Sequence, residues 1–155
     1  MPTLNDLTPA DRELLLAAAA VGGNAFNPVS RFQVGAALHA TDGRIYRGVN
    51  MEVAALPLGV CAEPAALTAG LTDGAREFDA IAVVGGDPAA VEAGRPVTPC
   101  GGCRQRIYDV TGGAATDLRV LCANLDLSEI LVVRITELLP YAFDAADLPA
   151  SSWSD

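Results

Sequence analysis

The sequence contains no lysine and a single histidine. Its ten cations are all arginines, scattered along 155 residues against 19 acidic side chains, so the formal net charge is −9. An acidic surface without a basic stripe is repelled by phosphate backbones. The composition therefore argues against a nucleic-acid polymer as partner and fits a small, neutral substrate.

Long apolar runs are also missing. No stretch reaches the roughly 18 apolar residues that a membrane-spanning helix requires, and the nearest run, 14–23, is too short. The first residues lack the basic start and apolar segment of a secretory signal. We therefore expect a cytoplasmic protein that does not associate with a membrane.

The length is that of about one domain. Because 51% of the residues are hydrophobic and only 19% are charged, the chain is expected to fold rather than remain disordered. The sequence contains no internal repeat or low-complexity linker. We expect a single domain over residues 1–155, with a loose tail from about residue 150.

Turn-forming residues divide the chain into alternating elements. Thr8 suits a helix N-cap and Pro9 the first helical position, which predicts a helix that ends at Gly22-Gly23. Apolar runs on either side of Thr41-Asp42-Gly43 predict a hairpin. Further elements are predicted as helices at 61–71 and 100–109, strands at 78–84, 118–123 and 130–135, and a helical turn at 136–139. This order indicates a layered α/β domain around one sheet.

The four cysteines point to metal or redox chemistry, because disulfides are rare in a chain without an export signal. Cys61 and the pair Cys100 and Cys103 each fall at the predicted start of a helix. Free backbone N–H groups and the helix dipole favour the thiolate there, and the thiolate is the metal ligand. Three thiolates on one zinc ion would leave its fourth position for water, as in a catalytic site.

Glu63 lies two residues after Cys61. A carboxylate beside a zinc-activated water can take its proton and pass it to a ring nitrogen and then to a leaving amine. Hydrolytic deamination requires this combination, so the spacing predicts Glu63 as the catalytic residue.

Two other interpretations of the cysteines stay open. The C-x-x-C spacing also occurs in redox pairs, and Cys122 could complete a closed structural zinc site. Cys122 lies in an apolar run, however, where free cysteine is commonly core material. His39 lies outside every motif and is interpreted as a surface residue.

Several further motifs occur in a fixed order from about residue 32 to residue 148. They are Phe32-Gln33-Val34-Gly35-Ala36-Ala37-Leu38, Gly48-Val49-Asn50-Met51-Glu52, Cys61-Ala62-Glu63, Pro99-Cys100-Gly101-Gly102-Cys103-Arg104-Gln105, Asn124-Leu125-Asp126, Glu137-Leu138-Leu139-Pro140, Phe143 and Asp147-Leu148. Together they resemble the cytidine deaminase family, in particular its small homotetrameric branch.

The resemblance implies a three-layer α/β/α sandwich around a mixed sheet of about five strands. It implies Zn²⁺ as the cofactor and the hydrolysis of cytidine or deoxycytidine to the uridine product and ammonia. It also implies a homotetramer with active sites shared between subunits. The substrate contacts that it implies are ribose at Asn50 and Glu52, the base at Phe32, the pyrimidine at the backbone of Ala62, and a neighbouring subunit's site at Phe143.

The sequence departs from the family pattern at three positions. Pro64 stands where the family usually has an arginine beside the catalytic glutamate, and Arg104 is a candidate to replace that charge. Val53 and Leu56 replace an asparagine and a tyrosine, which predicts a more apolar pocket. Two alternatives follow: a deaminase of modified cytosine nucleosides such as blasticidin-like antibiotics, and a non-catalytic zinc-bound nucleoside-binding protein.

Overall fold

One mixed sheet organises the part of the chain that the computed structural model describes, residues 1–90 and 94–149. Its strand order is β2-β1-β3-β4-β5. The strands are β1 (Gln33–Ala40), β2 (Ile45–Val49), β3 (Phe78–Gly86), β4 (Arg119–Asn124) and β5 (Ile130–Arg134). Only β3 and β4 pair in parallel; the other neighbours are antiparallel. The predicted mixed sheet of about five strands is confirmed.

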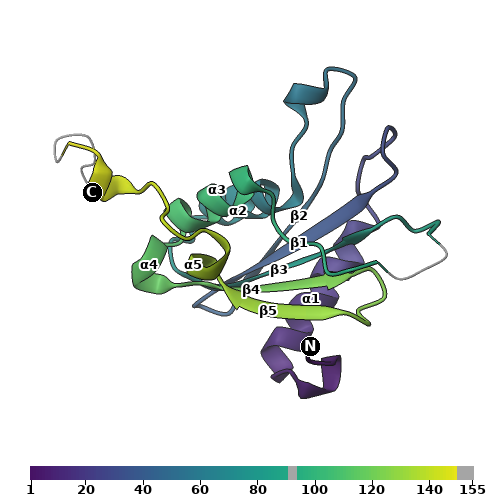
Figure 1. Cartoon of the computed structure of the whole chain (residues 1–155), viewed down its shortest axis with the longest axis horizontal. Coiled ribbons are helices and arrows are strands. Elements are labelled where there is room, and N and C mark those ends of the chain that lie inside the picture. The colour runs from purple at the N-terminus through teal and green to yellow at the C-terminus, as the bar shows by residue number, and fades with distance from the viewer. Residues whose placement is uncertain (91–93, 150–155) are drawn as a thin grey trace.

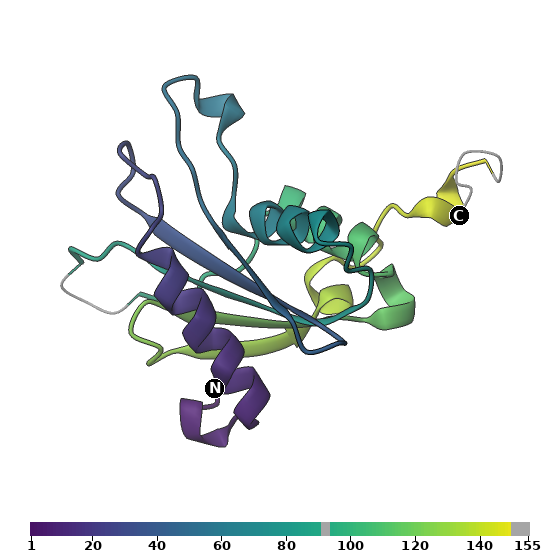
Figure 2. The ribbon, with the colours of Figure 1, turned by 180° about the vertical axis from the view of Figure 1, so that it is seen from behind.

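Helices cover both faces of the sheet (Figures 1 and 2). The helix α1 (Pro9–Gly22) lies on one face, whereas α2 (Ala62–Thr72) and α3 (Gly101–Val110) lie on the other. Short helical segments complete the fold: α4 (Gly113–Thr116), α5 (Ile135–Leu138), η1 (Leu4–Asp6), η2 (Leu56–Leu58) and η3 (Ala145–Asp147). None of the helices in residues 1–90 and 94–149 combines the length and apolar character needed to cross a membrane.

Two hydrophobic clusters fill the spaces between these layers. Alternate residues of β1 contribute to opposite clusters: Ala36 and Leu38 pack with α2 and α3, whereas Ala37 packs with α1. This division follows from the alternation of side chains across a strand. The α/β/α prediction is therefore confirmed, and the expected loose tail from about residue 150 lies outside the described residues.

The helix starts were predicted more accurately than the glycine-rich connections. The side chain of Thr8 accepts a hydrogen bond from the backbone N–H of Asp11, and Pro9 is the first residue of α1. By contrast, no element was predicted between the helix at 100–109 and the strand at 118–123, where Gly112 and Gly113 begin the additional helix α4. Both have positive φ angles, 91° and 57°, so the chain turns sharply there and then resumes helical geometry.

The helix α2 rests directly on β2 through backbone contact. A Cβ atom added at Gly48 would lie 2.3 Å from the carbonyl oxygen of Ala62 and 2.4 Å from the backbone nitrogen of Ala66. Only glycine permits this approach. Because Ala62 is the first residue of α2, the contact fixes where that helix begins.

We expect the substitution Gly48→Ala to lower the free energy of unfolding by about 3 kcal/mol, the upper end for overpacking, because the opposing atoms belong to the backbone. Urea denaturation measures this change. Gly94→Ala is the matched control, since a Cβ there meets nothing within 4 Å. Equal unfolding midpoints for the two variants would contradict this account of α2.

Candidate active site

Two helix N-termini bring three sulfur atoms together. Cys61 is the N-cap of α2, Cys100 is the N-cap of α3, and Cys103 lies in the first turn of α3. Their Sγ atoms all lie within 4.8 Å of one another, and those of Cys100 and Cys103 are 3.4 Å apart. A tetrahedral zinc ion with Zn–S bonds of about 2.3 Å requires sulfurs about 3.8 Å apart. The donor type and spacing therefore fit a zinc ion.

The electrostatics of the three thiols also favour a bound cation. Burial raises the pKa of the Cys61 and Cys103 thiols, and the charge of Glu63 raises both further. For Cys100, burial also opposes ionisation, but hydrogen bonding to the backbone and thiol of Cys103 lowers its pKa overall. A divalent cation stabilises the three thiolates, so metal binding here releases protons.

Glu63 is the buried acid of the site. It lies in the first turn of α2 with only 4% of its surface exposed. Burial raises the pKa of its carboxyl, and contact with the Cys103 thiol partly offsets that rise. A carboxyl whose pKa is raised gives up its proton less readily and takes one up more readily than an exposed carboxyl, which suits a group that moves protons.

A short backbone pairing holds the residue before Cys61 close to the end of β2. Met51 and Val60 exchange two backbone hydrogen bonds of 2.8 and 2.9 Å. They close the intervening segment into a loop that extends beyond the sheet in Figure 1. Glu52 follows the first paired residue and Cys61 follows the second. Glu52, the predicted sugar-binding residue, and Cys61, the predicted metal ligand, therefore lie at the two ends of one loop.

The structure brings Phe32, Asn50 and Glu52 together. The Asn50 side chain accepts a hydrogen bond from the Val34 backbone N–H and donates one to the Phe32 carbonyl oxygen, at 2.8 and 2.9 Å. The Glu52 carboxylate accepts hydrogen bonds from the segment that precedes Phe32. Phe32 itself is 40% exposed. Their roles in substrate binding stay predictions.

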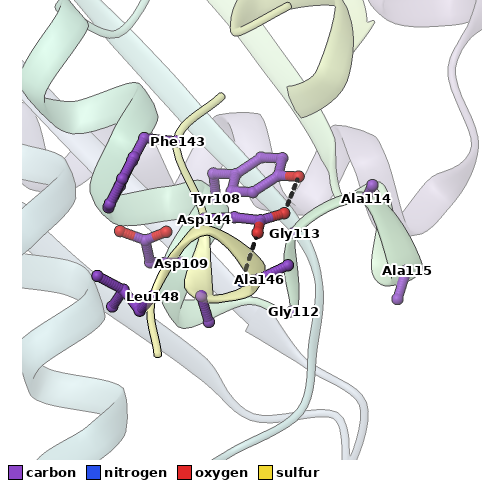
Figure 3. Close-up of a pocket in the computed structure, with 11 residues that line it drawn as sticks. Tyr108, Asp109, Gly112, Gly113, Ala114, Ala115, Phe143, Asp144, Ala146 and Leu148 are labelled. Carbon is purple, nitrogen blue, oxygen red and sulfur yellow. Dashed lines mark hydrogen bonds between the residues drawn. The ribbon is translucent and has the colours of Figure 1, made fainter. Parts of the chain in front are cut away.

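Ala62 is fully buried beneath β2, whereas Phe143 lies at the surface, where its carbonyl oxygen accepts a hydrogen bond from the Gln105 side chain. Phe143 is 59% exposed and borders a cavity of about 460 Å³ with Tyr108 and Leu148 (Figure 3). None of the residues that line this cavity is a cysteine or Glu63. The predicted role of Phe143 at a neighbouring site stays a prediction.

Arg104 holds the segment that precedes Cys100, and its replacement of the charge of the arginine that Pro64 displaces stays a prediction. Its guanidinium donates hydrogen bonds to the carbonyl oxygens of Pro99 and Leu138, at 2.8 and 2.9 Å, and to the Thr98 hydroxyl. It therefore holds the segment that precedes Cys100 through neutral oxygens. Nothing in these contacts shows it replacing the charge of the arginine that Pro64 displaces.

The remaining cysteine and the histidine lie outside the sulfur cluster. Cys122 on β4 is fully buried in the hydrophobic core. Among the described residues, the potential metal-binding group contains three cysteines and not four, so the closed four-cysteine site does not fit. His39 Nδ1 lies 2.7 Å from Asp79 Oδ1, in a contact between β1 and β3, and His39 is not a member of the three-cysteine group.

Ser30 contacts two of the predicted site residues but was not itself predicted from the sequence. Its hydroxyl donates a hydrogen bond to Glu52 and accepts one from the Phe32 backbone N–H. Its position two residues before Phe32 was the available signal. A serine so placed commonly bonds to the backbone of a turn, but its partner Glu52 is distant in sequence and could not be inferred from local spacing.

Comparison with known proteins identifies the class to which this fold and cysteine site belong. Residues 9–114 match the family model for the cytidine and deoxycytidylate deaminase zinc-binding region, so the chain belongs to this zinc-binding deaminase family. It is 41% identical over 139 residues to a cytidine deaminase of Halalkalibacterium halodurans, covering 89% of this chain and 98% of that protein.

Other proteins similar to this chain are also cytidine deaminases or probable cytidine deaminases. A probable cytidine deaminase of Dictyostelium discoideum is 37% identical, with 83% of this chain and 80% of that protein covered. The crystal structure of a cytidine deaminase from Burkholderia pseudomallei superposes with a TM-score of 0.75 at 38% identity, covering 88% of this chain and all of that chain. The similarity thus extends over nearly the full length of these proteins.

We expect the purified protein to contain about one zinc ion per chain. The substitution Cys61→Ala should reduce bound zinc to a small fraction of this amount, because two thiolates hold zinc far less tightly than three. Mass spectrometry of metal content after dialysis gives the ratio. Cys122→Ala is the matched control and should retain the ion; equal zinc loss in both variants would contradict the three-cysteine site.

Proposed function

We propose that this protein is a zinc-dependent cytidine deaminase that converts cytidine or deoxycytidine to uridine or deoxyuridine with release of ammonia. The observation that carries the proposal is the convergence of three thiols from two helix N-termini beside a buried glutamate whose pKa is raised. The family membership supports the same reaction.

In the proposed reaction, Cys61, Cys100 and Cys103 hold the zinc ion and Glu63 moves protons. The ion, when bound, supplies an activated water. Glu63 accepts a proton from that water and delivers it to N3 of the cytosine ring. The water oxygen bonds to C4 of the ring. Glu63 then takes the remaining proton of the added hydroxyl and passes it to the amine as the C4–N bond breaks, so one water is consumed and one ammonia is released. The buried position of Glu63 keeps both transfers away from bulk solvent.

The proposed substrate contacts come mainly from residues just after β2 and just before β1. Asn50 and Glu52 bind ribose hydroxyls, since an amide and a carboxylate together match groups that both donate and accept. Phe32 packs against the flat base, and the backbone of Ala62 contacts the pyrimidine. The absence of lysine and the net charge of −9 suit a neutral nucleoside.

We further propose a homotetramer, located in the cytoplasm, in which subunits share active sites. Leu56, Leu58 and Phe143 are 61%, 70% and 59% exposed in the isolated chain. Large apolar side chains exposed in groups are typical of protein interfaces. In this assembly Phe143 extends from its own subunit to the site of a neighbour.

A second candidate function is deamination of a modified cytosine nucleoside. The specific observation is the apolar character of the loop between Met51 and Val60, where Val53 and Leu56 stand in place of an asparagine and a tyrosine. A bulkier or less polar substituent on the nucleoside would contact this loop.

We expect Glu63→Gln to reduce kcat for cytidine by about 10²–10⁴-fold, the usual contribution of a general acid and base, while zinc stays bound. The fall in ultraviolet absorbance as cytosine becomes uracil gives the rate. A zinc-loaded wild-type protein inactive on cytidine and deoxycytidine but active on modified cytosine nucleosides would favour the second candidate. Nucleoside binding without any turnover would indicate a non-catalytic protein.

Light scattering should give a mass of four chains for the wild-type protein. Leu58→Asp should lower this mass, because burying an unpaired carboxylate in an interface is costly. Leu16→Asp, on the exposed side of α1, is the matched control and should leave the mass unchanged. A monomeric wild-type protein would argue against the shared active site.

A further inference from the structure

Three hydrogen bonds connect Glu52 to the segment that precedes Phe32. One carboxylate oxygen, Oε2, accepts from the backbone N–H groups of Val29 and Ser30, both at 3.0 Å. The other, Oε1, accepts from the Ser30 hydroxyl at 2.5 Å. Both oxygens are thus engaged by this one segment, which fixes the orientation of the carboxylate plane.

Ser30 also contacts Phe32. The Ser30 oxygen accepts a hydrogen bond from the Phe32 backbone N–H at 3.0 Å. One hydroxyl therefore joins the proposed sugar-binding carboxylate to the backbone of the proposed base-packing residue. Asn50 holds the same residue from the other side, through the Phe32 carbonyl oxygen.

The backbone of this segment adopts a conformation that requires support. Arg31, between Ser30 and Phe32, has a φ angle of +60°. A residue with a Cβ atom is disfavoured there and keeps this geometry only when its surroundings impose it. Further backbone hydrogen bonds join Phe26 to Asn50 and Glu52, at 3.1 and 2.7 Å, so the segment is held at both ends.

We propose that Ser30 is a positioning residue that orients Glu52 toward a sugar hydroxyl and holds Phe32 in register with it. This inference rests on the proposed nucleoside deaminase function. A carboxylate can accept about four hydrogen bonds, so Glu52 keeps about one acceptor site, on Oε1, beyond the three described. A carboxylate already ordered loses less freedom when substrate binds, which strengthens ground-state binding.

The kinetic test compares Ser30→Ala on two substrates. Cytidine carries the 2′ and 3′ hydroxyls that Glu52 can contact, whereas 2′,3′-dideoxycytidine lacks both. We expect KM for cytidine to rise about 10-fold, as for loss of one hydrogen bond to a charged group. The change in KM for dideoxycytidine should be less than 3-fold, with kcat for both within about 3-fold of wild type.

Matched variants separate positioning from general destabilisation. Ser30→Thr retains the hydroxyl and should restore KM for cytidine. The matched control is Thr3→Ala. It removes a hydroxyl that donates a hydrogen bond of 2.7 Å to the Asp6 carboxylate, and it should behave as wild type. Equal KM increases for both substrates, or a fall in kcat with KM unchanged, would overturn the proposal.

Hydrogen exchange provides a readout that needs no turnover. In Ser30→Ala, amides of residues 29–32 should exchange at least several-fold faster than in wild type, while those of α2 stay unchanged. Unaltered exchange overturns the structural part of the proposal even if the enzyme is active. A wild-type protein with normal exchange that neither binds nor converts any cytosine nucleoside overturns the proposed function, and the positioning role with it.

Discussion

The meeting of two helix N-termini at one end of the sheet is the constraint on which the rest of the site depends. Cys61 and Cys100 are N-caps, so their side chains lie where backbone N–H groups are unpaired by the helix. Bringing both ends together requires α2 and α3 to lie on the same face. The glycine at position 48 allows α2 to approach β2, and the parallel pairing of β3 with β4 places α3 as the crossover between them.

The same arrangement concentrates acidic groups. Three thiols and Glu63 occupy one region, and the charge of Glu63 raises the pKa of the Cys61 and Cys103 thiols. The arginine nearest in sequence, Arg104, is occupied with carbonyl and hydroxyl oxygens. Pro64 leaves the first turn of α2 without a cation, so the metal and the helix dipoles carry more of the stabilisation of the thiolates.

The parts of the fold that depend on neighbouring residues alone, such as helix starts and turns, could be predicted from the sequence. Local residue chemistry was enough to predict a helix start from Thr8 and Pro9, a hairpin from Thr41-Asp42-Gly43, and cysteines placed at helix starts. The helix after Gly112-Gly113 was missed because a glycine pair more often ends a helix than precedes one. The partners of Glu52 could not be predicted, since Val29 and Ser30 reach it only through strand pairing between distant segments.

The pairing of Met51 with Val60 separates the loop formed by residues 52–59 from the framework on either side. The two ends of the loop are joined by backbone hydrogen bonds. The loop can therefore change in length or in polarity with little effect on β2 or α2, which it connects. The loop can therefore diversify as an independent unit during evolution. Under the proposed function, a change in the range of nucleosides accepted would then require few substitutions and no rebuilding of the metal centre.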